Sequence, residues 1–204
     1  CIHCGHCVDV CPVSAKKIRN DLPQVINLLD HKTPLIASLA PSWLSEFPNL
    51  SPHQIILSLK KMGFNYISET AIGADILNLN LNKYIKKSSK KIHISSACPS
   101  VVEMIQKHYP QVSEYLTPFL SPLLIHSNYL KENLGSHYKI IFFGPCISKK
   151  KEADNFTSLL ESSLTFNDLR ALWEHYNINP SNLNDDKTQR FYPDFAGKGS
   201  FYPI

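Results

Sequence analysis

The chain has 204 residues, of which 43% are hydrophobic, and its 21 Lys and Arg residues against 17 Asp and Glu residues give a formal net charge of +4. A chain of this length can bury a proper core, and it contains no apolar run long enough to cross a bilayer, so we expect no membrane span within it. The positive excess is mild and comes with no nucleic-acid-reading motif, so we expect no nucleic acid partner.

The first eleven residues contain four cysteines with a diagnostic spacing. CIHCGHCVDVCP is the C-x2-C-x2-C-x3-C-P run of bacterial ferredoxins. Zinc sites more often use two separated C-x2-C pairs, and a disulfide knot does not suit a chain with a large core. Gly5 permits a tight turn, and we interpret His3 and His6 as spacers. The run therefore predicts 4Fe–4S binding by Cys1, Cys4, Cys7 and Cys11.

The fourth cysteine of such a run ligates the other cluster in two-cluster ferredoxins. Cys1, Cys4 and Cys7 would then share a cluster with a cysteine upstream of this chain, and Cys11 would serve an upstream cluster. No second run is present. We therefore interpret residues 1–20 as part of a ferredoxin-like module and the chain as a segment truncated at both ends, with an interrupted apolar tail at 201–204.

Strand and helix patterns alternate along residues 21–204. Three β-prone runs, at 34–42, 91–100 and 138–146, each meet a small residue and then a proline, and NYIS at 65–68 is a fourth candidate strand. Helical patterns occupy 22–30, 51–62, 71–87, 101–108 and 122–134. This alternation predicts an α/β domain with a mostly parallel sheet and helices on both faces.

Cys98 and Cys146 each follow one of the predicted strands. Ligands bind beyond the carboxyl ends of strands in parallel sheets, so we expect these thiols to lie near each other and to bind a metal. Pro99 suits the first position of a helix, where the helix dipole would favour a Cys98 thiolate. Two alternatives remain open: a small core residue, and a nucleophile assisted by His93 or His108.

Taken together, these motifs resemble the large-subunit domain of iron-only (FeFe) hydrogenases. The ferredoxin run, ISSACPS at 94–100, FFGPCISKKKEA at 142–153, LTFNDLRALWEHYNI at 164–178 and GSFYPI at 199–204 bear the resemblance, which extends over essentially the whole chain. It implies that residues 21–204 are the N-terminal part of an H-cluster domain. That cofactor is a 4Fe–4S cubane joined through a cysteine to a di-iron unit with carbonyl and cyanide ligands.

The resemblance also implies roles for individual residues. Cys98 matches the second cysteine of the family's T-S-C-C-P motif, and Cys146 matches the cysteine of M-P-C-x-x-K-x-x-E; both would ligate the cubane. Lys149 would donate a hydrogen bond to a cyanide, with Glu152 behind it at the motif's end. For Lys150 and Lys151 we expect a solvated surface. The family's third motif has two further cysteines, and none follows Cys146 here, so a missing carboxyl-terminal part must supply them or the site does not exist.

Three departures from the family pattern affect proton transfer. Ala97 replaces the cysteine that donates protons to the di-iron unit, and Gly144 replaces the methionine. Catalytic members carry glutamates after the pair Ala74-Asp75, where this chain has Asn78, Asn80 and Asn82, and an amide does not titrate near neutral pH. Together with Ala40-Pro41-Ser42, these departures are similar to the sensory hydrogenases, in which the domain precedes a PAS-type signalling module.

We therefore expect a cytoplasmic iron–sulfur protein that resembles FeFe hydrogenase in a sensory or low-turnover form, and a ferredoxin-type hydrogenase if it is active. Its partner would be a redox protein or a downstream PAS-type signalling domain. One alternative is a non-catalytic protein of the Narf-like branch, which works in iron–sulfur assembly and shares the S-x-C-P and P-C-x-x-K-K-x-E-A patterns. The other is a plain electron-transfer module whose α/β part has lost its cofactor.

Overall fold

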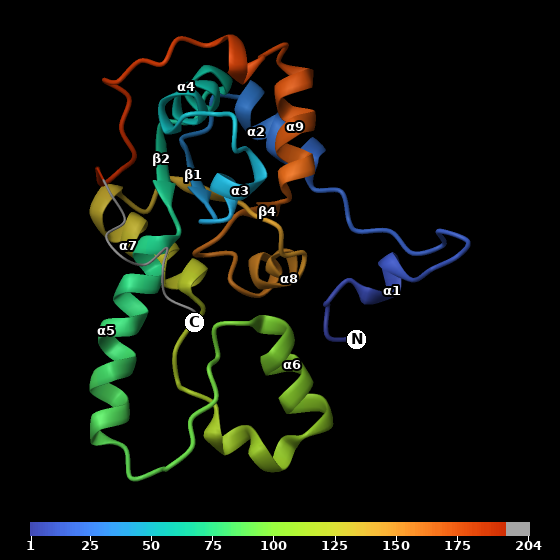
Figure 1. Ribbon diagram of the computed structural model, residues 1–204, viewed down its shortest axis with the longest axis vertical. Coiled ribbons are helices and arrows are strands. Elements are labelled where there is room, and N and C mark those ends of the chain that lie inside the picture. Colours follow the sequence, from blue (N-terminus) through green and yellow to red (C-terminus); the bar gives the residue numbers. More distant parts are fainter. Residues whose placement is uncertain (195–204) are drawn as a thin grey trace.

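A four-stranded parallel sheet forms the centre of the protein (Figure 1). The computed structural model describes residues 1–194. The strands are β1 (Leu35–Leu39), β2 (Tyr66–Glu69), β3 (Lys139–Phe143) and β4 (Ser162–Leu164), in the order β2-β1-β3-β4. Ala37 of β1 lies beside Ile67 of β2 and Ile141 of β3, and each neighbouring pair is parallel. The predicted α/β class with a parallel sheet is confirmed.

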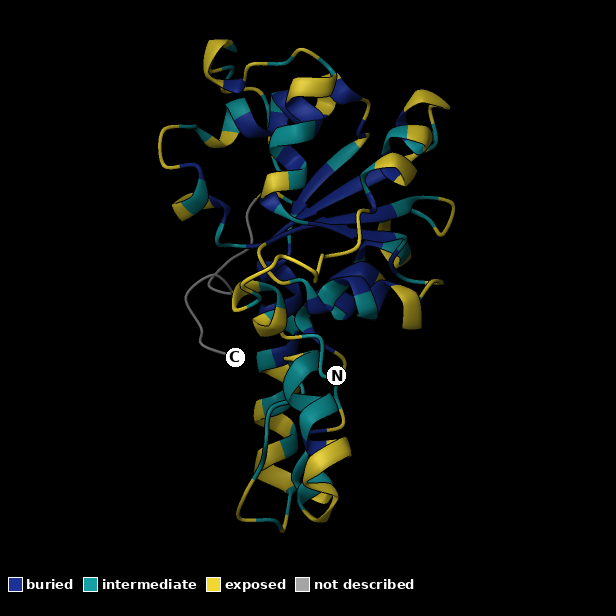
Figure 2. Ribbon diagram, turned by 90° about the vertical axis from the view of Figure 1, so that its right-hand side faces the viewer, coloured by how far each residue is buried: buried dark blue, intermediate teal, exposed yellow. Residues whose placement is uncertain are grey.

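Helices cover both faces of this sheet (Figure 2). Parallel strands need right-handed crossovers, which place the β1–β2 connection on one face and the β2–β3 and β3–β4 connections on the other. The first face has α2 (Leu22–Asp30), α4 (Pro52–Met62) and α9 (Phe166–His175), and Trp173 of α9 donates a hydrogen bond to Ser58 of α4 at 3.1 Å. The second face has the start of α5 (Ala71–Lys87), α7 (Pro122–Leu134) and α8 (Ser148–Asn155).

Five further elements lie outside these layers. They are α1 (His6–Asp9), α3 (Trp43–Glu46), α6 (Pro99–His108), η1 (Pro110–Tyr115) and η2 (Pro180–Asn182). Two helices begin at capping boxes, which satisfy backbone N–H groups that have no partner within the helix. In α4 the box joins Ser51 and Gln54, and in α9 it joins Thr165 and Asp168.

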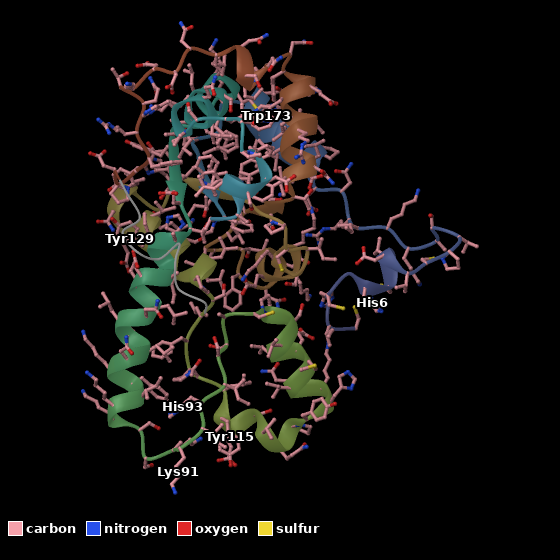
Figure 3. The ribbon with its side chains drawn as sticks, viewed as in Figure 1. His6, Lys91, His93, Tyr115, Tyr129 and Trp173 are labelled. Atoms are coloured by element: carbon pink, nitrogen blue, oxygen red, sulfur yellow. The ribbon has the colours of Figure 1, made fainter. Side chains whose placement is uncertain are left out.

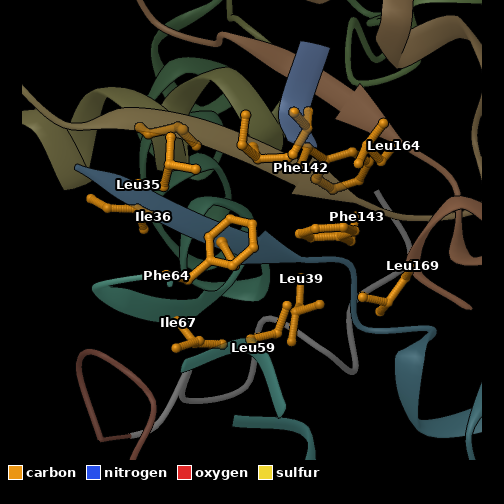
Figure 4. Close-up of a cluster of buried hydrophobic side chains, with 14 of the residues drawn as sticks. Leu35, Ile36, Leu39, Leu59, Phe64, Ile67, Phe142, Phe143, Leu164 and Leu169 are labelled. Carbon is orange, nitrogen blue, oxygen red and sulfur yellow. The ribbon is translucent and has the colours of Figure 1, made fainter. Parts of the chain in front are cut away.

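The core lies between the sheet and its helices (Figure 4). All five residues of β1 are buried, as expected for a central strand covered on both faces. Phe64 packs edge-on against Phe143, with ring centroids 5.7 Å apart. The other labelled core side chains are Leu35, Ile36, Leu39, Leu59, Ile67, Phe142, Leu164 and Leu169.

The expectation of a sheet strand at 91–100 is wrong. This segment makes a single parallel bridge, between Ile94 and Leu116, and Ile92 is 59% exposed. Ser96 uses its hydroxyl to bond Thr117 and the Phe119 carbonyl, so the segment is held to the following loop and not to the sheet. It forms, with α6, η1 and the end of α5, a lobe beneath the sheet that includes His93 and Tyr115 (Figure 3).

Residues 1–20 form an extended arm around α1 that lies beside α6 and α8 (Figure 1). Within residues 1–194, no helix combines the length and the apolar character needed to cross a membrane. The GSFYPI stretch at 199–204 and the apolar tail at 201–204 lie outside the described residues.

Candidate cluster-binding site

Three cysteines of the N-terminal run line one cavity of about 690 Å³, namely Cys1, Cys4 and Cys7. Gly5 lies between them with a φ of +88°, a conformation that side chains disfavour. A Cβ added to Gly5 would lie 2.9 Å from Cδ1 of Ile147, so glycine lets the run approach the residue next to Cys146. The other wall of the cavity includes Arg19 and Lys151.

Cys11 has a different environment from the other three thiols. It does not line the 690 Å³ cavity. Its sulfur accepts a hydrogen bond from the Ala15 N–H at 3.3 Å. The backbone N–H groups of Ala15, Lys16 and Val13 lower the pKa of Cys11, which favours the thiolate form that ligates metal. The run thus separates three thiols from the fourth.

Cys98 lies at the N-terminal end of α6, as predicted. Its backbone is extended, its carbonyl accepts the first helical hydrogen bond from Val102 at 3.1 Å, and Pro99 opens the helix. Cys146 follows β3 and lies just before α8, with its sulfur 2.9 Å from the Ser148 hydroxyl. Both thiols are free and exposed, so the alternative of small core residues is wrong.

The helix ends that carry these two thiols border a common space. A cavity of about 30 Å³ is lined by Pro99, next to Cys98, and by Ser148, two residues after Cys146, together with His3 of the run. Within residues 1–194, no three His, Cys, Asp or Glu side chains are arranged to hold a single metal ion. An iron–sulfur cluster does not need its ligands to converge on one ion, because each thiolate binds its own iron atom.

The donor sets fit such clusters in part. Cys1, Cys4 and Cys7 offer three free, exposed thiols at one cavity, and Cys98 with Cys146 offers two, where a 4Fe–4S cluster takes four. The remaining ligands of each cluster would come from outside the described residues.

Lys149 and Glu152 form a buried ion pair next to Cys146. The Lys149 ammonium donates to Oε2 of Glu152 at 2.7 Å, and their side chains are 11% and 9% exposed. The Ser121 hydroxyl donates to the same oxygen at 3.0 Å. An ammonium has three donors, so Lys149 can also serve an anion while Glu152 balances its charge. Glu152 and Ser121 face a second cavity of about 550 Å³, whose far wall includes Thr117.

Gly144, which replaces the family's methionine, is closely packed. A Cβ at this position would lie 2.5 Å from Cζ of Phe142 and 2.9 Å from Cβ of Ala40. The Phe142 ring therefore fills the space that a side chain at 144 would need, and the loops after β1 and β3 meet there. Ala97 is half-buried and donates its N–H to the Ser95 hydroxyl at 3.3 Å.

Of the three asparagines on α5, only one points inward. Asn78 is half-buried, and its Nδ2 has no hydrogen-bond partner among the residues the structure describes. Asn80 and Asn82 are exposed.

The solvated-surface expectation for Lys150 is wrong. Its side chain is 7% exposed and donates to Asp21 at 3.0 Å and to the Ser163 carbonyl at 2.9 Å. Successive residues of a helix point in directions about 100° apart, so a lysine triplet cannot share one face. Lys149 reaches Glu152, Lys150 enters the interior, and Lys151 is half-buried.

A buried histidine, which sequence reasoning missed, joins the ends of β1 and β2 to α7. His126 is fully buried, with Nδ1 2.9 Å from the Ser38 hydroxyl and Nε2 2.8 Å from the Ser68 hydroxyl. The Ser38 hydroxyl also lies 2.8 Å from that of Thr70. Burial lowers the pKa of His126 to about 3, so the ring is neutral. No local sequence signal distinguishes this histidine from the other eight.

The sequence of this chain is similar to sequences of iron-only hydrogenases and of an iron–sulfur cluster assembly factor. A sequence model described as "Iron only hydrogenase large subunit, C-terminal domain" matches residues 33–204. The "Cytosolic Fe-S cluster assembly factor NAR1" of Yarrowia lipolytica is 28% identical over 104 residues, covering 48% of this chain and 21% of that protein. The "NADP-reducing hydrogenase subunit HndD" of Solidesulfovibrio fructosivorans is 23% identical over 218 residues, covering 91% of this chain and 37% of that protein.

Solved structures with the same fold include a variant of the [FeFe]-hydrogenase HydA1 from Chlamydomonas reinhardtii. It matches with a TM-score of 0.67 and 21% identity over 81% of this chain and 50% of that chain. A structure titled for stepwise H-cluster assembly in HydA(deltaEFG) matches with a TM-score of 0.66 and 22% identity, over 81% of this chain and 49% of that chain. The chain spans about half the length of these structures and a smaller share of the curated relatives.

Proposed function

The chain belongs to the iron-only hydrogenase large-subunit family, and from that premise we propose that it forms part of an H-cluster protein with a sensory or low-turnover role. The domain would react with hydrogen or protons slowly and pass its redox state to a redox partner or to a downstream PAS-type signalling domain. Residues 1–20 would be part of a ferredoxin-like module, and residues 21–204 part of the H-cluster domain.

One observation supports cluster binding above the others. Cys98 and Cys146 are free, exposed thiols at the N-terminal ends of two helices that border a common cavity. They would ligate the cubane, while Cys1, Cys4 and Cys7 would hold a separate 4Fe–4S cluster and Cys11 would serve another. Bound there, the H-cluster supplies one-electron redox chemistry and the exchange between protons and hydrogen.

The chain's own residues would hold and protect an anionic group at this site. Lys149 would donate a hydrogen bond to it, and Glu152, oriented by Ser121, would keep the ammonium charged in a site with little water. Phe142 would exclude water where other family members use methionine.

The low-turnover part of the proposal depends on groups that cannot carry a proton. Ala97 has no titratable atom, and the inward-pointing Asn78 offers an amide where a carboxylate would be needed. Loss of a positioned proton donor typically costs about 10²–10⁴ in rate. A protein built in this way can report the state of its cluster without consuming much substrate.

Infrared spectroscopy and hydrogen evolution on anaerobically matured full-length protein test the proposal. We expect carbonyl and cyanide infrared bands, and slow hydrogen evolution when a reduced dye supplies the electrons. Ala97→Cys should recover only part of the rate, because the Asn78 amide cannot pass a new proton to the thiol. Cys98→Ser is the control and should lose the bands while keeping the same far-UV circular dichroism. Equal, high turnover in the parent and in Ala97→Cys would contradict a sensory role.

A second candidate function is suggested by the identity to the assembly factor. A non-catalytic iron–sulfur protein of that kind would bind 4Fe–4S clusters and no di-iron unit. The same experiment separates the two, because such a protein would contain iron and sulfide but show no carbonyl or cyanide bands.

A further inference from the structure

The N-terminal cysteine run is held at its first residue by α6. The Lys107 ammonium, in the last turn of this helix, donates to the Cys1 carbonyl at 2.8 Å. Glu103, one turn earlier on α6, pairs with the same ammonium. A backbone contact of this kind fixes the chain itself, whatever side chains the run carries.

The segment after the run is held by α8. Both Asp154 oxygens, near the end of that helix, accept hydrogen bonds from Arg19 at 2.9 Å. Arg19 also donates to Asp21 at 2.6 Å, and Asp21 pairs with the buried Lys150 of α8 at 3.0 Å. Nη1 of Arg19 meets both Asp154 oxygens, whereas Nε and Nη2 make a bidentate contact with Asp21, which fixes the orientation of the guanidinium.

The middle of the run touches the same two helices near their other ends. Gly5 meets Ile147 at the start of α8, and His3 borders a cavity with Pro99 at the start of α6. Each helix therefore begins beside a candidate cubane ligand, Cys98 or Cys146. Near its other end, α6 contacts the first residue of the run, and α8 contacts Arg19 in the segment after the run.

We infer that Lys107 and Arg19 are positioning residues that hold the N-terminal cysteine run at a set distance from Cys98 and Cys146. The spacing between the two cysteine-bearing segments is then determined by α6 and α8, because each helix begins next to Cys98 or Cys146 and contacts residue 1 or 19 near its other end. The rate of electron transfer falls exponentially with distance, so this spacing would set how fast electrons pass between the clusters. The role in electron transfer rests on the proposed function; the attachment of the run does not.

The Lys107 contact with Cys1 and the Arg19 contact with Asp154, which we call the two grips, act together. The side chains of Lys107 and Arg19 are 46% and 51% exposed, and exposed pairs contribute little singly. With one grip released, the other still holds the run and the Gly5 contact with Ile147 still forms. We therefore expect a non-additive response, in which the double variant loosens the run far more than the two single variants combined.

Hydrogen–deuterium exchange of the full-length protein tests this inference. In Lys107→Met/Arg19→Met, the hydrogen-bonded amides of Val8, Asp9 and Val10 should exchange at least about tenfold faster than in the parent, and amides of β1 and β3 should not change. Each single variant should change much less, and Lys107→Arg should behave as the parent because it keeps a cationic donor. The matched control is Arg170→Met, which removes the Arg170–Glu46 pair far from the run.

Unchanged exchange of these three amides in the double variant, or an equal increase in Arg170→Met, would overturn the inference. In protein loaded with both clusters, the magnetic coupling between the reduced clusters should weaken in the double variant and persist in Lys107→Arg. A parent that takes up no iron would count against the proposed function, while exchange of the metal-free chain would still decide whether the grips exist.

Discussion

Phe142 and Gly144 adjoin each other at the end of β3, and only one of the two positions has room for a side chain. The ring of Phe142 lies where a Cβ at 144 would be, and the Cβ of Ala40 limits the other side. The position of the Phe142 ring thus requires a glycine at 144. Restoring a methionine here would require changing both residues.

Gly144→Ala should lower the free energy of unfolding by about 1–3 kcal/mol, because the added methyl overlaps the Phe142 ring. Phe142→Leu frees that space, so the double variant should be more stable than the sum of the single effects by about 1 kcal/mol. Urea unfolding measures all three. The control pairs Gly144→Ala with Phe64→Leu, a core ring that contacts Phe143. Strict additivity in the Phe142 pair would contradict the packing described.

His126 makes stability depend on pH. Its folded-state pKa of about 3 lies below the ordinary value of 6.5, so the unfolded chain binds the proton more readily and stability falls as pH falls from 6.5 towards 3. Between pH 7 and pH 5 this group should remove about 2 kcal/mol from the free energy of unfolding.

Urea titrations of the metal-free protein at these two pH values measure that loss. His126→Gln, which lacks the ionisable ring, should show a correspondingly smaller loss, and His31→Gln, at an exposed position, should match the parent. The assignment fails if the parent and His126→Gln lose the same amount.

Among the elements, α5 and α7 show how a helix pair depends on one small residue. A Cβ on Gly73 of α5 would lie 2.0 Å from the Pro122 carbonyl oxygen and 2.9 Å from Cβ of His126. The obstacle is backbone, which no rotamer change can move, so the two helices can meet only at a glycine. Their contact also closes the pocket around the buried His126.

Gly73→Ala should therefore separate α5 from α7 and cost about 4 kcal/mol or more, which exceeds the usual effect of a single substitution. Thermal unfolding followed by circular dichroism should show a much lower midpoint or no folded protein. Lys83→Ala, at an exposed position of the same helix, should change stability by less than about 0.5 kcal/mol. A Gly73→Ala protein as stable as the parent would show that the helices do not approach this closely.

Sequence patterns predicted elements whose signals are local. Periodicity and terminal residues gave the ranges of α2, α5 and α7, and Pro99 correctly marked Cys98 as the cap of α6. The segment 91–100 has the composition of a strand but no neighbour in the sheet, because pairing is decided by distant residues. Lys150 and His126 were misjudged or missed for the same reason, since their partners lie in other elements of the chain.

At the scale of the whole molecule, the candidate ligands form two groups on different supports. Cys1, Cys4 and Cys7 belong to the N-terminal arm, whereas Cys98 and Cys146 belong to loops of the α/β domain and its lobe. The arm touches the domain through α6 and α8, so we expect cluster binding by one group to be independent of cluster binding by the other. The cysteine spacing predicted the first group. The second was predicted from two strand ends, of which only that of β3 before Cys146 belongs to the sheet.

Cys4→Ser in protein extended upstream should remove one cluster's worth of iron and its reduced-state EPR signal, because the cluster loses one of its thiolates. The infrared bands assigned to the H-cluster should persist. Cys98→Ser should have the opposite pattern, with the EPR signal kept and the bands lost. Loss of both signals in either variant would show that the two groups depend on each other.

The sheet order has a consequence for how the protein is made. Ala37 in β1 must pair with Ile141 in β3, which leaves the ribosome much later. At about 5–20 residues per second, β1 waits on the order of 10 s with the backbone N–H and C=O groups of one edge unpaired. Nascent chains in this interval are candidates for capture by chaperones or for aggregation. Poor yield of a β1 or β3 variant would then reflect events during translation, before any cluster could be inserted.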